Sequence, residues 1–164
     1  MSDQPKPDLP RDRIVGLTLD TASIRRSNAS IHHEREVAIY DILEENSFRL
    51  EGYDRGPYHL KLSIAEDRLH FSIADTDEHA LTTHMFSLSP FRRVIKDYFL
   101  VCESYYDAIR TAPPSRIQSI DMGRRGLHDE GSRLLCERLE GKIAIDHDTS
   151  RRLFTLICAL HWKG

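Results

Sequence analysis

The sequence predicts an α+β protein, in which an antiparallel β-meander of about four strands is covered on one face by helices. Apolar and polar residues alternate along much of residues 48–88, which is the period of strands with one buried face. Residues 90–110 instead carry apolar side chains at spacings of three and four, the period of an amphipathic helix. Strands followed by helices are typical of the α+β class.

Length and composition are those of one ordinary globular domain. The chain has 164 residues, of which 40% are hydrophobic and 30% charged, and no apolar run is long enough to span a bilayer. Residues 1–13 hold three prolines and few apolar side chains, which predicts a flexible leader. Residues 14–164 are then expected to form a single α+β domain, large enough to fold without disulfides.

The three cysteines, Cys102, Cys136 and Cys158, are widely spaced and odd in number. Neither a CxxC pair nor the Cys/His spacing of a zinc site is present. We therefore expect buried, reduced thiols in a cytoplasmic bacterial protein, and we predict neither a cofactor nor a metal site.

Two elements precede the meander. Residues 14–20 predict a short strand, followed by a polar loop at 21–30. An apolar stripe that starts at Ile31 predicts a helix ending near Glu45. The remaining extended segments are expected at 48–51, 58–65, 69–74, 81–88 and 143–145.

The stretch from Ser89 to Arg110 predicts the central core helix. Ser89 is expected to cap it, and Pro90 to occupy the first position, where a missing N–H is harmless. The apolar face carries nine side chains, five of them aromatic, and a buried aromatic ring removes a large area from water. We expect this helix and the C-terminal helices to cover the sheet.

The C-terminal third is also predicted to be helical. A short helix is expected over residues 115–122, then a glycine-punctuated segment over 123–131, and then a second helix that Gly141 ends as a C-cap. Asp148 or Thr149 is expected to cap the last helix.

Charge is distributed unevenly along the chain. Residues 1–86 hold 10 Lys and Arg against 16 Asp and Glu, whereas residues 87–164 hold 13 against 10, and ten of those thirteen are Arg. A chain whose net charge is −3 can therefore still present a basic face.

Five basic residues form the candidate anion site. They are Arg92, Arg93 and Lys96 on the polar side of the central helix, and Arg124 and Arg125 between two glycines. Arginine presents a planar fork of donors that suits phosphate or carboxylate, and neighbouring glycines let backbone N–H groups approach an anion. The alternative is a solvated face with local ion pairs, because carboxylates of the same helix lie within reach.

His128, Asp129 and Glu130 adjoin the second pair of arginines. A histidine beside carboxylates can act as a general base or hold a metal, so His128 and Glu130 are the candidate catalytic residues. The alternative is a helix N-terminus, where acidic side chains are favourable for electrostatic reasons alone.

Three histidines, His59, His70 and His84, fall on neighbouring predicted strands. Imidazoles on one face of a sheet can bind a transition metal, but the phase of the third strand is ambiguous, and scattered solvent-facing histidines are the alternative. The chain has no GxSxG motif, and Cys102 lies on the apolar stripe, so we predict no activated nucleophile.

Several stretches resemble an uncharacterised protein family of alphaproteobacteria. They are LSPFRRVIKDYFLVCESYYDAIR, IDMGRRGLHDEGSRLL and RRLFTLICALHWKG, with LTLD, SNASIHHEREVAIYDILEENSF and GPYHLKLSI nearer the N-terminus. The resemblance covers nearly all of the chain after the leader. It implies a cytoplasmic bacterial protein, and it implies no catalytic residue, because the function of that family is not established.

Two functional hypotheses follow. The first is a non-enzymatic binding or regulatory protein whose arginine-rich surface engages an anionic partner, either RNA, a nucleotide or an acidic protein. The second is a small enzyme that acts on a phosphorylated or carboxylated metabolite, with His128 as acid or base. A homodimer or scaffold is a third hypothesis, which an exposed apolar patch near Trp162 would indicate. No membrane partner is expected.

Overall fold

The computed structural model describes residues 11–20 and 29–161, with the backbone alone for 29–31 and 161. It confirms the predicted α+β class, with a four-stranded, mostly antiparallel sheet and four helices. Most of the predicted leader, the polar loop at 21–28 and Trp162 lie outside the described residues.

The main sheet has the strand order β1-β3-β4-β5. Its strands are β1 (Ile14–Leu19), β3 (Tyr58–Ala65), β4 (Arg68–Ala74) and β5 (Ala80–Ser87). β3, β4 and β5 form the predicted antiparallel meander, whereas β1 pairs with β3 in parallel. A parallel pair needs a crossover, and helix α1 (Ala29–Glu44) lies between these two strands in the sequence.

The alternation of residue types puts one face of the sheet in the core. Leu60 pairs with Ile73 and Leu62 pairs with Phe71, and all four side chains are buried. A shift of one residue in this pairing would turn these apolar side chains to the outer face, so the pattern itself specifies the register.

A second, two-stranded sheet joins distant parts of the chain. Its strands, β2 (Phe48–Leu50) and β6 (Ile143–Ile145), pair in antiparallel fashion. Phe48, Leu50 and Ile143 are buried. The sequence predicted both segments as extended, but it carried no signal that they pair with each other.

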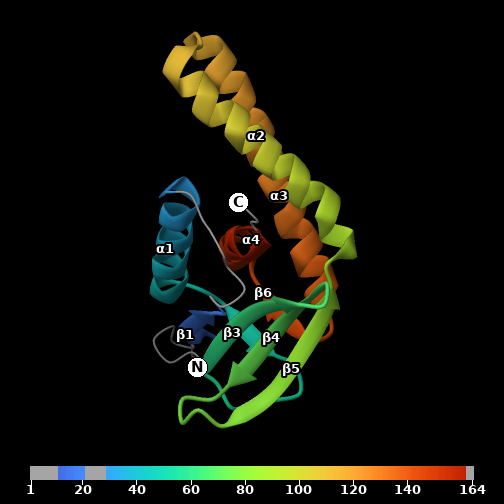
Figure 1. Ribbon diagram of the computed structural model, residues 1–164. Helices are drawn as coiled ribbons and strands as arrows, with labels where there is room; N and C mark the ends of the chain where they lie inside the picture. Colours follow the sequence, from blue (N-terminus) through green and yellow to red (C-terminus); the bar gives the residue numbers. More distant parts are fainter. Residues whose placement is uncertain (1–10, 21–28, 162–164) are drawn as a thin grey trace, which may run out of the picture.

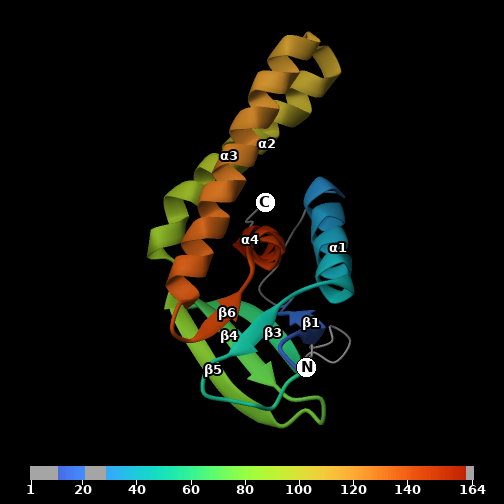
Figure 2. The ribbon, with the colours of Figure 1, turned by 180° about the vertical axis from the view of Figure 1, so that it is seen from behind.

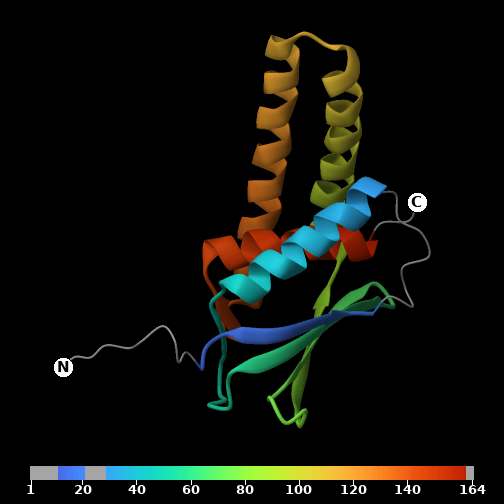
Figure 3. The same ribbon diagram turned by 90° about the vertical axis from the view of Figure 1, so that its left-hand side faces the viewer.

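The helices form two layers above the sheet (Figure 3). Helices α1 and α4 (His147–His161) lie next to the sheet, and a long hairpin of α2 (Arg92–Thr111) and α3 (Pro114–Leu139) projects away from it (Figure 1). Views from opposite sides both place α4 between α1 and α3 (Figures 1 and 2). None of the helices in the described ranges is long and apolar enough to cross a membrane.

Helix α4 occupies the centre of the fold. Leu153, Phe154 and Leu156 are fully buried, whereas Arg151 and Arg152 on another side of the helix are partly exposed, which is the pattern of an amphipathic helix. The aromatic helix α2 is buried along its first half, where Tyr98 packs against the body of the protein, but Ile109 near its far end is 50% exposed. The distal part of α2 therefore packs along α3 rather than on the sheet.

The predicted interruption within α3 is wrong. The helix runs unbroken for 26 residues through Gly123, Gly126 and Gly131, although each helical glycine costs about 1 kcal/mol relative to alanine. At Gly131 a Cβ atom would lie 2.2 Å from the ring of Phe154, so glycine is what lets α3 approach α4 there. The predicted C-cap at Gly141 is also wrong, because α3 ends at Leu139 with Glu140 as its C-cap. Gly141, with a φ of 87°, lies in the following turn, which the N–H of Lys142 closes by donating to the carbonyl of Leu139.

Two predicted N-caps are also wrong. Ser89 belongs to a 3-10 turn, η2 (Ser89–Phe91), which precedes α2, and no side chain caps either helix. Asp146 caps α4 in place of Asp148 or Thr149, because its Oδ1 accepts a hydrogen bond of 2.8 Å from the N–H of Thr149. In both cases the helix starts earlier or later than its apolar pattern indicated.

Candidate functional site

A cavity of about 590 Å³ lies where the four helices meet. Its lining consists of His33, Glu34, Val37, Ala38 and Asp41 from α1, Tyr98 from α2, Arg124, Arg125 and His128 from α3, and Arg151, Arg152 and Thr155 from α4. Four arginines of α3 and α4 therefore share one cavity with two carboxylates of α1. We call this the arginine cavity.

Arg124 and Arg125 are held by one carboxylate, that of Asp121 one turn earlier on α3. Arg124 donates to Oδ1 of Asp121 from Nε at 3.1 Å and from a terminal nitrogen at 2.6 Å, and Arg125 lies 2.8 Å from Oδ2. The hydrogen bonds from Arg124 lower the pKa of Asp121, so this carboxylate is charged at neutral pH. The Arg124 guanidinium also lies 4.3 Å from the ring centroid of Tyr105, and its side chain is only 26% exposed, against 72% for Arg125.

Each of the two arginines of α4 in the cavity lining is held by a contact with another part of the chain. Arg151 forms an ion pair with Asp129 of α3, and Arg152 donates a hydrogen bond of 3.2 Å to the backbone carbonyl of Glu45. A guanidinium has five N–H donors, so each of these contacts leaves donors available to a ligand.

His128 lines the cavity as a partly buried, neutral imidazole. Its Nε2 lies 2.8 Å from Oγ1 of Thr155, whose own hydroxyl donates to the backbone carbonyl of Arg151, so Nε2 carries the hydrogen. The rings of Tyr98 and Phe154 lie 5.4 Å and 5.3 Å from the imidazole, and Nδ1 has no hydrogen-bond partner among the described residues. Burial, assisted by the positive charge of Arg151, lowers the pKa of His128 to about 4.

The structure separates the five predicted anion-binding residues into two groups. Arg124 and Arg125 line the arginine cavity, whereas the lining drawn from residues 11–20 and 29–161 includes none of the basic residues predicted on α2. Arg92 pairs with Asp67 at 2.5 Å, in the turn between β3 and β4. Arg93 pairs with Glu130 at 2.7 Å, so that carboxylate is directed to α2. His128 and Glu130, proposed together from the sequence, therefore have different partners. His128 contacts Thr155 of α4, and Glu130 pairs with Arg93 of α2.

Four cavity residues were missed at the sequence level. Arg151 and Arg152 stand next to each other at the start of α4, and Glu34 and Asp41 lie two turns apart on α1. The signal that could have indicated them is the charge asymmetry between the acidic N-terminal and basic C-terminal halves of the chain.

The three strand histidines do not share a face of the sheet. His84 is paired with Phe71, whose side chain is buried, and so it lies on the inner face. His70 pairs with Ser63 and belongs to the outer face, together with His59. Burial and the charge of Lys142 lower the pKa of His84.

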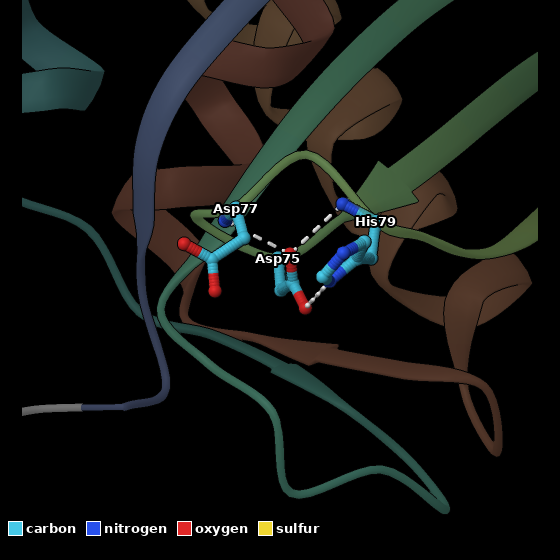
Figure 4. A group of neighbouring side chains, drawn as sticks. All are labelled: Asp75, Asp77 and His79. Carbon is cyan, nitrogen blue, oxygen red and sulfur yellow. Dashed lines mark hydrogen bonds and ion pairs between the residues drawn. The ribbon is translucent and has the colours of Figure 1, made fainter.

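Asp75, Asp77 and His79 form another group of ligand-type side chains, in the turn between β4 and β5 (Figure 4). Oδ1 of Asp75 accepts hydrogen bonds of 2.9 Å from the backbone N–H groups of Asp77 and His79. Oδ2 lies 3.0 Å from Arg55 and 3.3 Å from Nδ1 of His79. Both oxygens of this buried carboxylate already have partners, and Arg55 supplies a positive charge. We therefore interpret Asp75 as a structural residue that closes the turn.

The three cysteines are free thiols, as predicted. Cys102 and Cys158 are buried, and burial raises the pKa of Cys102 to about 11 and that of Cys158 well above its usual range. Neither of these two thiols is a nucleophile at neutral pH.

Comparison with known proteins places the chain among close relatives. The model of the uncharacterised protein family UPF0262 matches residues 11–163. A UPF0262 protein of Bradyrhizobium sp. (strain BTAi1) is 58% identical over 165 residues, which cover 100% of this chain and 98% of that protein. A UPF0262 protein of Rhodopseudomonas palustris (strain TIE-1) is 58% identical over 160 residues, 98% of each chain, and one of Nitrobacter hamburgensis is 56% identical over the full length of both.

No solved structure matches the chain significantly, so the assignment rests on sequence. The family resemblance expected from the motifs is confirmed, and the relatives carry no description of an activity. The chain belongs to the uncharacterised protein family UPF0262.

Proposed function

We propose that this protein binds a small ligand through a phosphate or carboxylate group in the arginine cavity. The observation that carries the proposal is that four arginines of two helices line a single cavity of about 590 Å³. Cavities of roughly 300–1,000 Å³ hold small molecules, and a guanidinium matches the planar, two-oxygen edge of both anions.

The arrangement of the positive charges favours a small ligand over RNA or an acidic protein. Those partners need an extended basic surface, but Arg92 and Arg93 lie outside the cavity lining and are paired with Asp67 and Glu130. Arg124, Arg125 and Arg151 are also paired with carboxylates, but they line one cavity together with Arg152, and these ion pairs hold their side chains in position there. Such preorganisation lowers the entropy lost when an anion binds.

Arg125 offers the cleanest test of this proposal. Its side chain is 72% exposed, so Arg125→Gln removes a cavity charge with little effect on folding. Arg92→Gln is the matched control, because Arg92 lies outside the cavity lining and is also half exposed. We would measure binding of pyrophosphate and citrate by calorimetry at several salt concentrations.

We expect Arg125→Gln to weaken binding about tenfold and to reduce its salt dependence, whereas Arg92→Gln should match the unaltered protein. Absence of binding by both anions, or an equal loss in the two variants, would overturn the proposal.

The position of His128 favours one alternative, an enzyme that uses the same cavity. His128 is a neutral imidazole that lines the same cavity as Arg124 and Arg151, and its buried Nδ1 would accept a proton from a metabolite only where the bound molecule reaches that atom. In that case His128→Gln would retain ligand binding and abolish turnover of the ligand, as followed by NMR of the ligand. A bound ligand that stays chemically unchanged would favour binding alone.

We also propose a cytoplasmic location. The three unpaired cysteines support it, since reduced thiols are typical of that compartment. Fractionation of cells that express the tagged protein would test it.

A further inference from the structure

The charges of the arginine cavity are segregated by helix. Both carboxylates of the lining, Glu34 and Asp41, belong to α1, and all four arginines belong to α3 and α4. Among the described residues, the cavity arginines form ion pairs with Asp121 and Asp129 of α3, and with no carboxylate of α1. Opposite charges thus share one cavity without neutralising each other.

Helix α1, which carries both carboxylates, is held to the rest of the protein near each of its ends. Near the C-terminal end of α1, the Asn46 amide donates to the carbonyls of Ile14 at 2.9 Å and Ile42 at 2.7 Å, and its oxygen accepts from the N–H of Ile14. Toward the other end, Glu34 accepts a hydrogen bond of 2.5 Å from the hydroxyl of Tyr106. These contacts fix the position of α1, and of its carboxylates, in the lining of the cavity.

An apolar strip lies in the same cavity as the two charged sides. Val37 and Ala38 of α1 and the buried ring of Tyr98 from α2 belong to the lining. Such a strip accommodates a short hydrocarbon segment, and a segment of this kind joins the two charged ends of an ω-amino acid.

We propose that the ligand is a small zwitterion, with its anionic group at the arginines of α3 and α4 and its ammonium group at Asp41 of α1. This inference rests on the proposed function, and it adds a positively charged group to the anionic ligand proposed there. A ligand with both charges satisfies both sides of the cavity, whereas a dianion would place one anionic end beside carboxylates that have no cation.

The test compares ligands of one length that differ in the charge of one end. δ-Aminovalerate, glutarate and cadaverine carry one charge of each sign, two negative charges and two positive charges, respectively. Calorimetry should show δ-aminovalerate binding at least about tenfold more tightly than glutarate, and cadaverine most weakly. γ-Aminobutyrate and ε-aminocaproate extend the comparison to shorter and longer chains.

Two variants test the ammonium end and the anionic end of the ligand independently. Asp41→Asn should abolish the preference for the amino acid over glutarate, and Arg125→Gln should weaken the amino acid and glutarate alike. Asp107→Asn is the control, because Asp107 is exposed near the far end of α2 and outside the cavity.

The outcomes distinguish the two proposals. The zwitterion proposal would be overturned if glutarate bound as tightly as every ω-amino acid and if Asp41→Asn left the ratio of their affinities unchanged. Anion binding, the proposed function, would remain intact in that case. No binding of any of these ligands, nor of pyrophosphate or citrate, would overturn both. Binding of γ-aminobutyrate or ε-aminocaproate in place of δ-aminovalerate, with the same response to Asp41→Asn, would support the zwitterion and define its length.

Discussion

The hydroxyl of Tyr106 on α2 donates a 2.5 Å hydrogen bond to the carboxylate of Glu34 on α1. The two residues are 72 positions apart in sequence, and their contact ties the projecting hairpin to the helix that forms one wall of the arginine cavity. Burial and this bond to the carboxylate raise the pKa of Tyr106, so its hydroxyl remains a donor throughout the physiological range.

Replacement of Tyr106 tests the value of this contact. Tyr106→Phe removes one partly buried, charge-assisted hydrogen bond and should lower the free energy of unfolding by about 1–2 kcal/mol. Urea unfolding would measure it, and hydrogen exchange should show faster exchange in α1. Tyr40→Phe, at an exposed position of α1, is the control and should leave both unchanged. Equal midpoints for the two variants would contradict the prediction.

The partly buried His128 should make the protein sensitive to acid. Its folded-state pKa of about 4 lies below the usual 6.5, so the unfolded chain takes up the proton first as the pH falls. Stability attributed to the neutral imidazole is complete above pH 6.5 and is lost progressively down to about pH 4. The loss should be on the order of 2 kcal/mol after allowance for partial solvation.

His128→Gln retains a donor for Thr155 but does not titrate, so this acid-dependent loss should shrink. Urea midpoints across this pH range would show it, with His70→Gln on the outer face of the sheet as control. If the urea midpoint fell as steeply with decreasing pH in His128→Gln as in the unaltered protein, His128 would be ruled out as the cause of the acid sensitivity.

The glycines of α3 should respond to alanine with opposite signs. Gly131→Ala places a methyl group against the Phe154 ring and should cost about 1–3 kcal/mol or more, since the two helices must separate. Gly126→Ala meets no atom within 4 Å, and it should stabilise the helix by about 0.5–1 kcal/mol. Thermal unfolding of both variants would measure the difference, and a loss of equal size in both would refute the packing argument.

Loss of the cap of α4 should be measurable. Asp146→Ala removes the acceptor for the N–H of Thr149, at an expected cost of about 1 kcal/mol in the free energy of unfolding. Asp148→Ala, in the first turn of the same helix, tests whether negative charge alone accounts for the effect. A larger loss for Asp148→Ala would show that charge, and not the cap, is decisive.

Part of the candidate site could be anticipated. Arg124, Arg125 and His128 were selected for their residue types and spacing, and all three line the cavity. The grouping of Arg92 and Arg93 with them could not be decided from helical spacing, because the pairing of these residues depends on Asp67 in a distant turn and on Glu130 of the facing helix. Whether a charge is neutralised depends on neighbours that only the packed chain supplies.

The sequence alone determined the element types, the buried face of the meander and the family, because periodicity and local composition are properties of neighbouring residues. Tertiary structure decided that α3 continues through its glycines, since the packing of α3 against α2 and α4 outweighs their low helix propensity. It also decided that Arg151 and Arg152 line the same cavity as Arg124 and Asp41. That convergence depends on the docking of α1, α3 and α4, which no local pattern encodes.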